Sequence, residues 1–421
     1  MAWRDLVILT WIYRKPVNTD KIFMHTPRTM DPISNPFTPG AGTQPPELAG
    51  REALREALRV AMQRARHGRA FKSVILLGLR GVGKTVLLDR MRADAEQAGL
   101  RTLRIEAPEG RSLPAILAPQ LRSALLRLSL ADRARELAGR ALRALTGFVR
   151  VVKLRFQDVE MSLEGSTEPG LADNGDLASD LTDLLQAVGE TAQAAGTVIV
   201  MFIDELQYVP EAQLAALITA LHRGAQRNLP IMLVGAGLPQ LRGQLGQAKS
   251  YAERMFEFPT IGALGPEDAR RAIRQPIEDA GARIDEQALD GILRQTQGYP
   301  YFLQEWGKHA WDVASGSPLR AVDVDHASAL AVSALDANFF GVRFDRLAPS
   351  EKRYLRAMAE LGPGPHRSGD IAQRLGREVT SLGPTRAKLI AKGMVWSPTH
   401  GDTAFTVPLF DAYMRRVMPD L

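Results

Sequence analysis

A glycine-rich segment combines the residue types that bind the phosphates of a nucleotide. Residues Gly78–Thr85 read Gly-Leu-Arg-Gly-Val-Gly-Lys-Thr. Glycines let successive backbone N–H groups curve around a phosphate, where larger side chains would block the approach. The Lys84 ammonium is expected to reach the β- and γ-phosphates of ATP, and the Thr85 hydroxyl to bind Mg²⁺. Nucleotide contacts are therefore expected from this phosphate loop and the residue after it: Gly78, Gly81, Val82, Gly83, Lys84, Thr85 and Val86.

The segments on either side of the phosphate loop are suited to position it. The apolar run 74–77 predicts a buried parallel strand that leads directly into the loop. Residues 85–98 predict the following helix, whose positive N-terminal end would point at the same phosphates. A chance match to the eight-residue pattern is conceivable, but one placed between a strand and a helix is rare.

A pair of carboxylates ends a second apolar strand. Asp204 and Glu205 follow the apolar run 197–203. They would emerge at the carboxyl edge of a parallel sheet, beside the phosphate loop. Asp204 is suited to hold the magnesium through water, and Glu205 to polarise the water that attacks the γ-phosphate. The alternative is a strand that simply ends in solvated acids.

These two motifs resemble the Walker A and Walker B motifs of the AAA+ and STAND branch of P-loop ATPases. Gly50-Arg51-Glu52 resembles the Gly-Arg-Glu box of those families, which implies that Arg51 lies near the adenine. Gly298-Tyr299-Pro300 resembles the Gly-x-Pro motif of STAND-type lids, which implies that Pro300 faces the nucleotide. The succession of core, helical lid and winged helix is similar to archaeal and bacterial origin-recognition-like ATPases, over about residues 46–421.

The chain departs from that resemblance at two positions, and matches it at a third. The strand 231–234 runs into Gly235-Ala236-Gly237, where many AAA+ enzymes place a polar sensor residue. Tyr301 stands where a second sensor arginine is common. Arg254 resembles the arginine finger that completes a neighbour's site in a homo-oligomer; it could equally be an ordinary surface arginine. The missing sensors favour slow hydrolysis or a switch over a fast motor.

Strands that alternate with helices predict an α/β fold with a parallel sheet covered on both faces. We expect a flexible N-terminal extension over residues 1–45 and a P-loop ATPase core over 46–264. The strand-like alternation from Val149 to Leu163 predicts a hairpin insertion near 148–175. A helical lid is expected over 265–340, and a winged helix-turn-helix domain, hereafter the C-terminal module, over 341–421.

The C-terminal module is basic, which suggests that it binds an anionic partner. Its thirteen Lys and Arg against eight Asp and Glu give a net charge of +5, most of the +6 of the whole chain. The resemblance to a winged helix implies that its second helix enters the major groove of double-stranded DNA. Candidate phosphate contacts are Arg377, Arg386, Lys388 and Lys392. The alternative is that the module packs against protein.

Composition excludes several other classes of function. The chain has no cysteine, so it forms no disulfide or thiolate metal site, and a reducing cytoplasm is the simplest location. Its seven histidines are scattered, and no metal besides Mg²⁺ is expected. Its longest apolar runs are far shorter than a membrane span, so no membrane association is expected. The apolar stretch 6–13 precedes its basic residues, which is the wrong order for a signal peptide.

Two functions fit these observations. The first is an ATP-regulated ATPase whose nucleotide state sets the position of a DNA-binding winged helix. The second is a STAND-like signalling switch, in which the module contacts protein. The basic C-terminal module favours the first, and the Gly-x-Pro motif and missing sensors favour the second. A purely structural nucleotide-binding protein is disfavoured because Glu205 is present.

Overall fold

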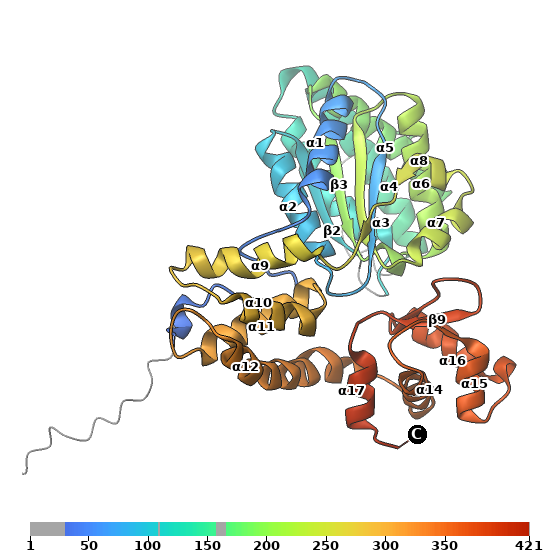
Figure 1. The fold of residues 1–421 in the computed structure, drawn as a ribbon. Coiled ribbons are helices and arrows are strands. Elements are labelled where there is room, and N and C mark those ends of the chain that lie inside the picture. Colours follow the sequence, from blue (N-terminus) through green and yellow to red (C-terminus); the bar gives the residue numbers. More distant parts are fainter. Residues whose placement is uncertain (1–29, 108–109, 157–165, 421) are drawn as a thin grey trace, which may run out of the picture.

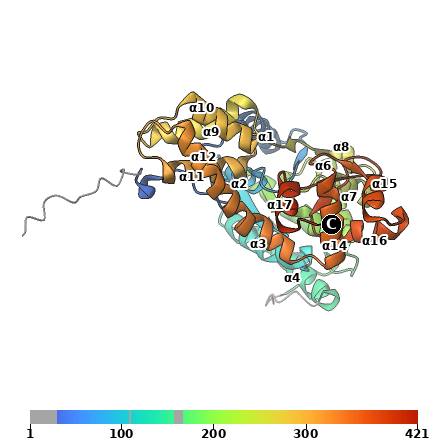
Figure 2. The same ribbon diagram turned by 60° about the horizontal axis from the view of Figure 1, so that its bottom comes forward.

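The computed structural model describes residues 30–107, 110–156 and 166–420. Figure 1 shows an α/β core at the top, with the helical lid and the C-terminal module side by side beneath it. Figure 2, which turns the lower side forward, shows helix α12 extending from the lid toward the module. Within the described residues, no helix is long and apolar enough to cross a membrane.

The core is built on one sheet whose strands are parallel and ordered β2-β3-β4-β1-β5, with β6 also paired to β1. Strand β1 lies between β4 on one side and the short strands β5 and β6 on the other, and its carboxyl end continues into the phosphate loop. The strands are β1 (Ser73–Gly78), β2 (Arg101–Glu106), β3 (Ile199–Asp204), β4 (Ile231–Gly237), β5 (Phe256–Glu257) and β6 (Thr260–Ile261).

Helices cover both faces of this sheet because its strands are apolar on both sides. Along β3, Val200 and Phe202 belong to the same apolar cluster as α2, whereas Met201 and Ile203 join the cluster formed with α3 to α6. The core helices are α1 (Glu52–Arg66), α2 (Lys84–Gln97), α3 (Leu113–Leu128), α4 (Arg135–Arg155), α5 (Leu177–Ala194), α6 (Glu211–Gln226), α7 (Leu241–Ala248) and α8 (Ala252–Met255).

The hairpin expected near 148–175 is wrong for residues 148–155, which continue helix α4. Ala141, Leu145, Phe148 and Val152 are all buried at helical spacing, so one apolar face runs through the region that was interpreted as alternating. Burial of that face outweighs the β-propensity of the valines. Residues 157–165 lie outside the described residues, and residues 166–175 form turns and bends without a helix or strand.

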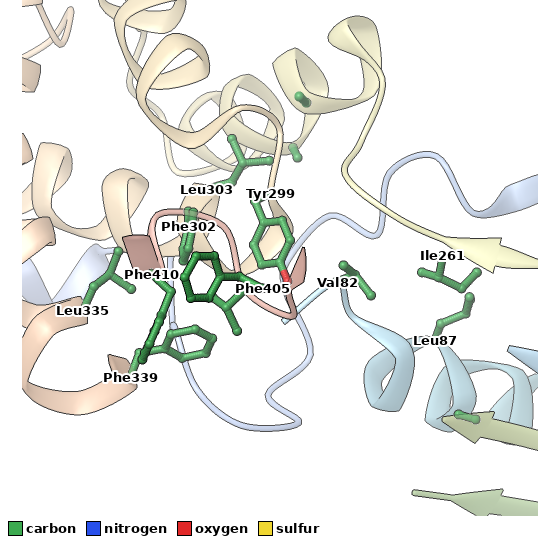
Figure 3. Packing of buried hydrophobic residues seen from close by; sticks show 14 of the residues in the cluster. Val82, Leu87, Ile261, Tyr299, Phe302, Leu303, Leu335, Phe339, Phe405 and Phe410 are labelled. Atoms are coloured by element: carbon green, nitrogen blue, oxygen red, sulfur yellow. The ribbon is translucent and has the colours of Figure 1, made fainter. Parts of the chain in front are cut away.

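The lid is helical, as the sequence indicates. It comprises α9 (Pro266–Asp279), α10 (Glu286–Thr296), α11 (Pro300–Val313) and α12 (Ala321–Ala334). A π-helical segment, Leu335–Gly341, connects the lid to the short helix α13 (Val342–Asp345), which precedes the main helices of the C-terminal module. One continuous apolar cluster joins residues of a sheet face, the lid and the module. Figure 3 shows part of it, with Phe302 and Phe339 near Phe405 and Phe410.

The expectation of a flexible extension is wrong for residues 30–45, which lie along the lid and are called the strap below. The Asn35 amide donates to the Lys308 carbonyl (3.0 Å) and to the Asp312 carboxylate (2.8 Å). Phe37 is only 2% exposed and packs against Gly307, where a Cβ would lie 2.7 Å from its ring. The strap is therefore anchored by both polar and apolar contacts. Residues 1–29 lie outside the described residues.

The C-terminal module combines helices with a small antiparallel sheet of order β7-β9-β8. A final helix, which the sequence interpretation did not include, packs on the first one. Its helices are α14 (Pro349–Glu360), α15 (Ser368–Leu375), α16 (Val379–Ala391) and α17 (Phe410–Val417). Its strands are β7 (His366–Arg367), β8 (Val395–Trp396) and β9 (Asp402–Phe405).

Candidate nucleotide-binding site

A cavity of about 750 Å³ lies where the core, strap, lid and C-terminal module meet. The core contributes Arg51, the phosphate loop and Glu205; the strap contributes Thr38–Thr43 and Pro45. The volume falls within the range of small-molecule sites. Six basic side chains line this cavity against two acidic ones, Glu47 and Glu205, so it suits a polyanion. The six are Arg51, Arg80, Lys84, Arg343, Arg346 and Lys392.

The phosphate loop presents most of its predicted residues to this cavity: Gly81, Val82, Gly83, Lys84, Thr85 and Val86 line it. Gly78 does not. A Cβ on Gly78 would lie 2.3 Å from the carbonyl oxygen of Ile261, so this glycine is needed for the close approach of strands β1 and β6. The prediction of Gly78 as a nucleotide contact is corrected accordingly.

Lys84 is buried at the start of helix α2, where its ammonium donates to the carbonyl of Leu79 (2.8 Å). Burial lowers the pKa of Lys84 to about 8, against the attraction of Glu205 and Asp204, which raises it. The lysine is thus a cation held in a poorly hydrated place beside a set of other cations. Phosphate oxygens would restore the solvation that burial removes.

Thr85 and Asp204 converge, as expected for a shared magnesium site. The Thr85 hydroxyl donates to the Asp204 carboxylate (2.7 Å), and the backbone N–H of Glu205 donates to its other oxygen (2.9 Å). Burial raises the pKa of Asp204, so this carboxylate gains from a nearby cation. One hydroxyl and one carboxylate, completed by phosphate oxygens and water, are a donor set that fits Mg²⁺. Within the described residues, no cluster of three or more acidic or histidine side chains offers another metal site.

Glu205 lies at the cavity wall in a left-handed backbone conformation (φ 54°), which is uncommon outside glycine. Its carboxylate accepts a hydrogen bond from the Gln207 amide, whose own oxygen accepts from the backbone N–H of Leu238 (3.1 Å). Gln207 therefore bridges Glu205 to the end of strand β4. Strand β4 itself offers no polar side chain there, and the chain supplies one from the turn after β3 instead.

The lid forms hydrogen bonds with the backbone of the phosphate loop. The Tyr299 hydroxyl donates to the Arg80 carbonyl, and the Tyr301 N–H donates to the Gly81 carbonyl (3.2 Å). Figure 3 shows Tyr299 reaching from the lid toward the loop that carries Val82. Pro300, between these tyrosines, lines the cavity as the Gly-x-Pro resemblance implies.

Arg51 lines the same cavity and links two segments of its wall. Its guanidinium donates to the carbonyl of Gly262 (2.6 Å), just after strand β6, and burial lowers its pKa. The side chain thereby ties the start of helix α1 to the segment that leads into the lid. Its expected position near an adenine stays a prediction.

Arg254 is exposed on helix α8, away from the cavity. The next strand, β5, pairs with Ser73 and Val74, at the opposite end of β1 from the phosphate loop. Roughly 16 Å of strand separates these two ends. Arg254 can therefore reach a phosphate only in another copy of the chain.

The four expected DNA contacts divide into two pairs. Arg377 and Lys388 are exposed around helix α16. Arg386 instead donates to the Thr403 and Ser397 hydroxyls (both 2.8 Å), and Lys392 forms an ion pair with Glu351 (2.7 Å) and lines the nucleotide cavity. Residues distant in sequence thus already bind the side chains of Arg386 and Lys392, and a phosphate contact by either would have to replace these partners.

The sequence interpretation missed several residues of the site. The strap, Arg80, Tyr208 and Arg343 line the cavity, and Gln207 contacts Glu205. Arg80 is the one with an available signal, since a basic residue inside a phosphate-binding loop is chemically suggestive. An isolated aromatic residue in a Pro- and Gly-rich segment, Phe37, was a weaker sign of an anchored strap. Arg343 lies 259 positions beyond the phosphate loop's Lys84 and carried no local signal.

The parallel sheet and the phosphate loop at the end of β1 have the arrangement expected from the two Walker motifs, a P-loop type of α/β core. Residues 47–234 match the AAA ATPase domain family. Residues 337–414 match a domain of unknown function, DUF8462. The matched range includes Arg343, Lys392 and most of the C-terminal module. No curated protein matches the chain in sequence.

Three of the solved structures that match the chain follow, and the first of them, with a TM-score above 0.5, has a similar fold. A Walker-type ATPase of Pyrococcus abyssi has a TM-score of 0.56 at 14% identity, covering 89% of this chain and 97% of that one. The Holliday junction branch migration motor RuvB of Thermotoga maritima has a TM-score of 0.43 at 16% identity, covering 86% and 96%. Orc1 of Aeropyrum pernix, solved in complex with DNA, has a TM-score of 0.44 at 16% identity, covering 88% and 94%.

Proposed function

We propose that this chain binds ATP with Mg²⁺, hydrolyses it slowly, and uses the bound nucleotide to set the position of its C-terminal module. The observation that carries the proposal is the cavity itself, where six basic side chains and a phosphate loop converge from three parts of the molecule. A nucleotide bound there would touch the core, lid and module at once. Such a ligand favours the arrangement that makes the most contacts with it.

Each catalytic role falls to a group already in reach of the cavity. Lys84 and the loop N–H groups bind the β- and γ-phosphates, and Thr85 with Asp204 holds magnesium, which neutralises charge on those phosphates. Glu205 orients the attacking water. Its hydrogen bond to Gln207 occupies one carboxylate oxygen and must be kept or exchanged as water binds. That restraint, with no polar side chain from β4, supports slow turnover.

The module's partner has two candidates. The order α14, β7, α15, α16, β8, β9 supports a winged helix-turn-helix, with α16 as the helix that enters a DNA groove. Arg377 and Lys388 remain exposed for phosphate contacts. The alternative is a STAND-like switch whose module contacts protein. The engagement of Arg386 and Lys392 inside the molecule favours this alternative, since it halves the expected phosphate contacts.

A salt series with duplex DNA separates the two candidates. Each phosphate contact lowers log affinity by about 0.9 per unit of log salt. Arg377→Ala and Lys388→Ala should each reduce that slope by about one, equally on every DNA sequence. Arg353→Ala, which removes an exposed arginine from α14, is the matched control and should leave the slope unchanged. A full-length protein with no affinity for duplex DNA at low salt, with or without ATP, would leave protein as the partner.

A further inference from the structure

Arg80 and Arg343 both line the cavity, and neither has a carboxylate partner among the described residues. Arg80, in the phosphate loop, donates one N–H to the Tyr208 hydroxyl (2.8 Å), while its buried Nε has no hydrogen-bond partner. Arg343, on α13, donates to the Phe339 carbonyl and lies 4.1 Å above the Phe339 ring. Across the described ranges, neither guanidinium forms an ion pair. Both line the same cavity as the buried Lys84.

This concentration of unpaired positive charge is costly unless an anion relieves it. Burial, with a smaller contribution from the nearby Arg80, lowers the pKa of Arg343 to about 10. Arg80 also lowers the pKa of Lys84. Guanidinium groups bind phosphate oxygens through paired N–H groups, and such charge-assisted bonds are among the stronger ones in proteins. The chemistry of these side chains therefore matches a phosphate group.

The same two arginines join the phosphate loop to the C-terminal module. Arg343 follows the π-helical segment that connects the lid to the module, and the Phe339 ring beneath it stacks on Tyr301 (4.6 Å). Arg80 touches the module directly. A Cβ added to Gly393 would lie 2.8 Å from its Nη2 atom. An anion bound by both arginines would thus contact the core and the connection to the module together.

We infer that Arg80 and Arg343 together bind the terminal phosphate of a nucleoside triphosphate, so that the cavity distinguishes ATP from ADP. This inference rests on the proposed ATP site. Tyr301 stands in the lid where a sensor arginine is common. Arg343, on helix α13, supplies a cation to the cavity in its place. Loss of the terminal phosphate on hydrolysis removes the anion between the two arginines. Their mutual repulsion then favours release of the module from the phosphate loop.

Calorimetric titration of the full chain with ADP and with a non-hydrolysable ATP analogue, both with Mg²⁺, tests this inference. Arg343→Gln should weaken the triphosphate by roughly tenfold or more, the effect of one charge-assisted hydrogen bond, and leave ADP nearly unchanged. Arg353→Gln, in the same module but outside the cavity, should leave both affinities unchanged. Equal losses for the two nucleotides, or no loss for either, would overturn the inference.

Two further variants guard against ambiguous results. Arg80→Gln should show the same selective loss as Arg343→Gln, which makes the result independent of whether Arg343→Gln folds normally. Arg343→Lys keeps the charge without the planar fork, and should recover part of the preference for triphosphate. If the wild-type chain binds neither nucleotide, the proposed ATP site itself has failed. If instead the wild type binds both nucleotides and Arg343→Gln keeps the same preference for the triphosphate, only the inference about the two arginines has failed.

Discussion

Replacing Phe37 with alanine should detach the strap from the lid and open the nucleotide cavity. The Phe37 side chain is almost completely buried against helix α11, whereas Ile33, four residues earlier in the same strap, is 93% exposed. Truncation of a buried phenylalanine costs about 3–5 kcal/mol. Because the strap is a surface segment tied down at a few points, we expect most of that cost to weaken its docking. A loss of about 3 kcal/mol corresponds to roughly 150-fold in the docking equilibrium.

Hydrogen exchange of the backbone amides in residues 38–45, with and without ATP, measures this effect. Phe37→Ala should accelerate exchange in the strap, and ATP affinity should fall because strap residues line the cavity. Ile33→Ala is the matched control, and should change neither. Equal exchange in the two variants would show that Phe37 does not hold the strap, and unchanged ATP affinity with faster exchange would remove the strap from the site.

Three other predictions concern individual side chains. Burial lowers the pKa of Lys84 to about 8, so the side chain is mostly neutral above that pH in the free protein, and ATP affinity should fall there. At pH 8, ATP binding should take up about half a proton, which calorimetry in buffers of different ionisation enthalpy measures. The pKa of Lys84 in the folded protein lies below its value in the unfolded chain, so the Lys84 contribution to the free energy of unfolding should rise from pH 8 to about 10.5. A fall in that contribution over this range would contradict the lowered pKa of Lys84. Arg254→Ala mixed with Lys84→Ala should recover ATPase activity if Arg254 acts on a second copy, whereas concentration-independent turnover insensitive to Arg254→Ala would leave it a surface residue. Gln207→Ala should change kcat with little effect on ATP affinity, since Gln207 contacts Glu205 rather than the phosphates; a change confined to affinity would refute this positioning role.

The phosphate loop and Asp204-Glu205 could be predicted from sequence because their chemistry is local. A glycine-rich turn after an apolar strand allows few other interpretations, and parallel strands bring Thr85 and Asp204 to the same edge. The central strands and most helices follow from apolar periodicity for the same reason. The predicted parallel-sheet α/β core is confirmed, and residues 47–234 match the AAA ATPase domain family.

What could not be predicted depends on contacts between distant parts of the chain. The partner of Arg386 is Thr403 on another element, so helix position alone could not show that this arginine is occupied. Arg343 reaches the cavity only because the lid folds back onto the phosphate loop. The strap was misinterpreted since proline and glycine normally indicate loops, and composition does not show that Phe37 is buried. Helix α4 was misinterpreted where its sequence is rich in β-branched valines, although Val149 and Val152 extend its buried face.

The most direct test of the account is phosphate release from ATP by the wild-type chain and by Glu205→Gln, measured together with ATP affinity. The wild type should release phosphate slowly and only with Mg²⁺, because Thr85 and Asp204 supply its protein ligands. Glu205→Gln should bind ATP about as tightly as the wild type while phosphate release is lost, since the carboxylate acts on water rather than on the nucleotide. Equal phosphate release by the two proteins, or release that is indifferent to Mg²⁺, would contradict the proposed catalytic site.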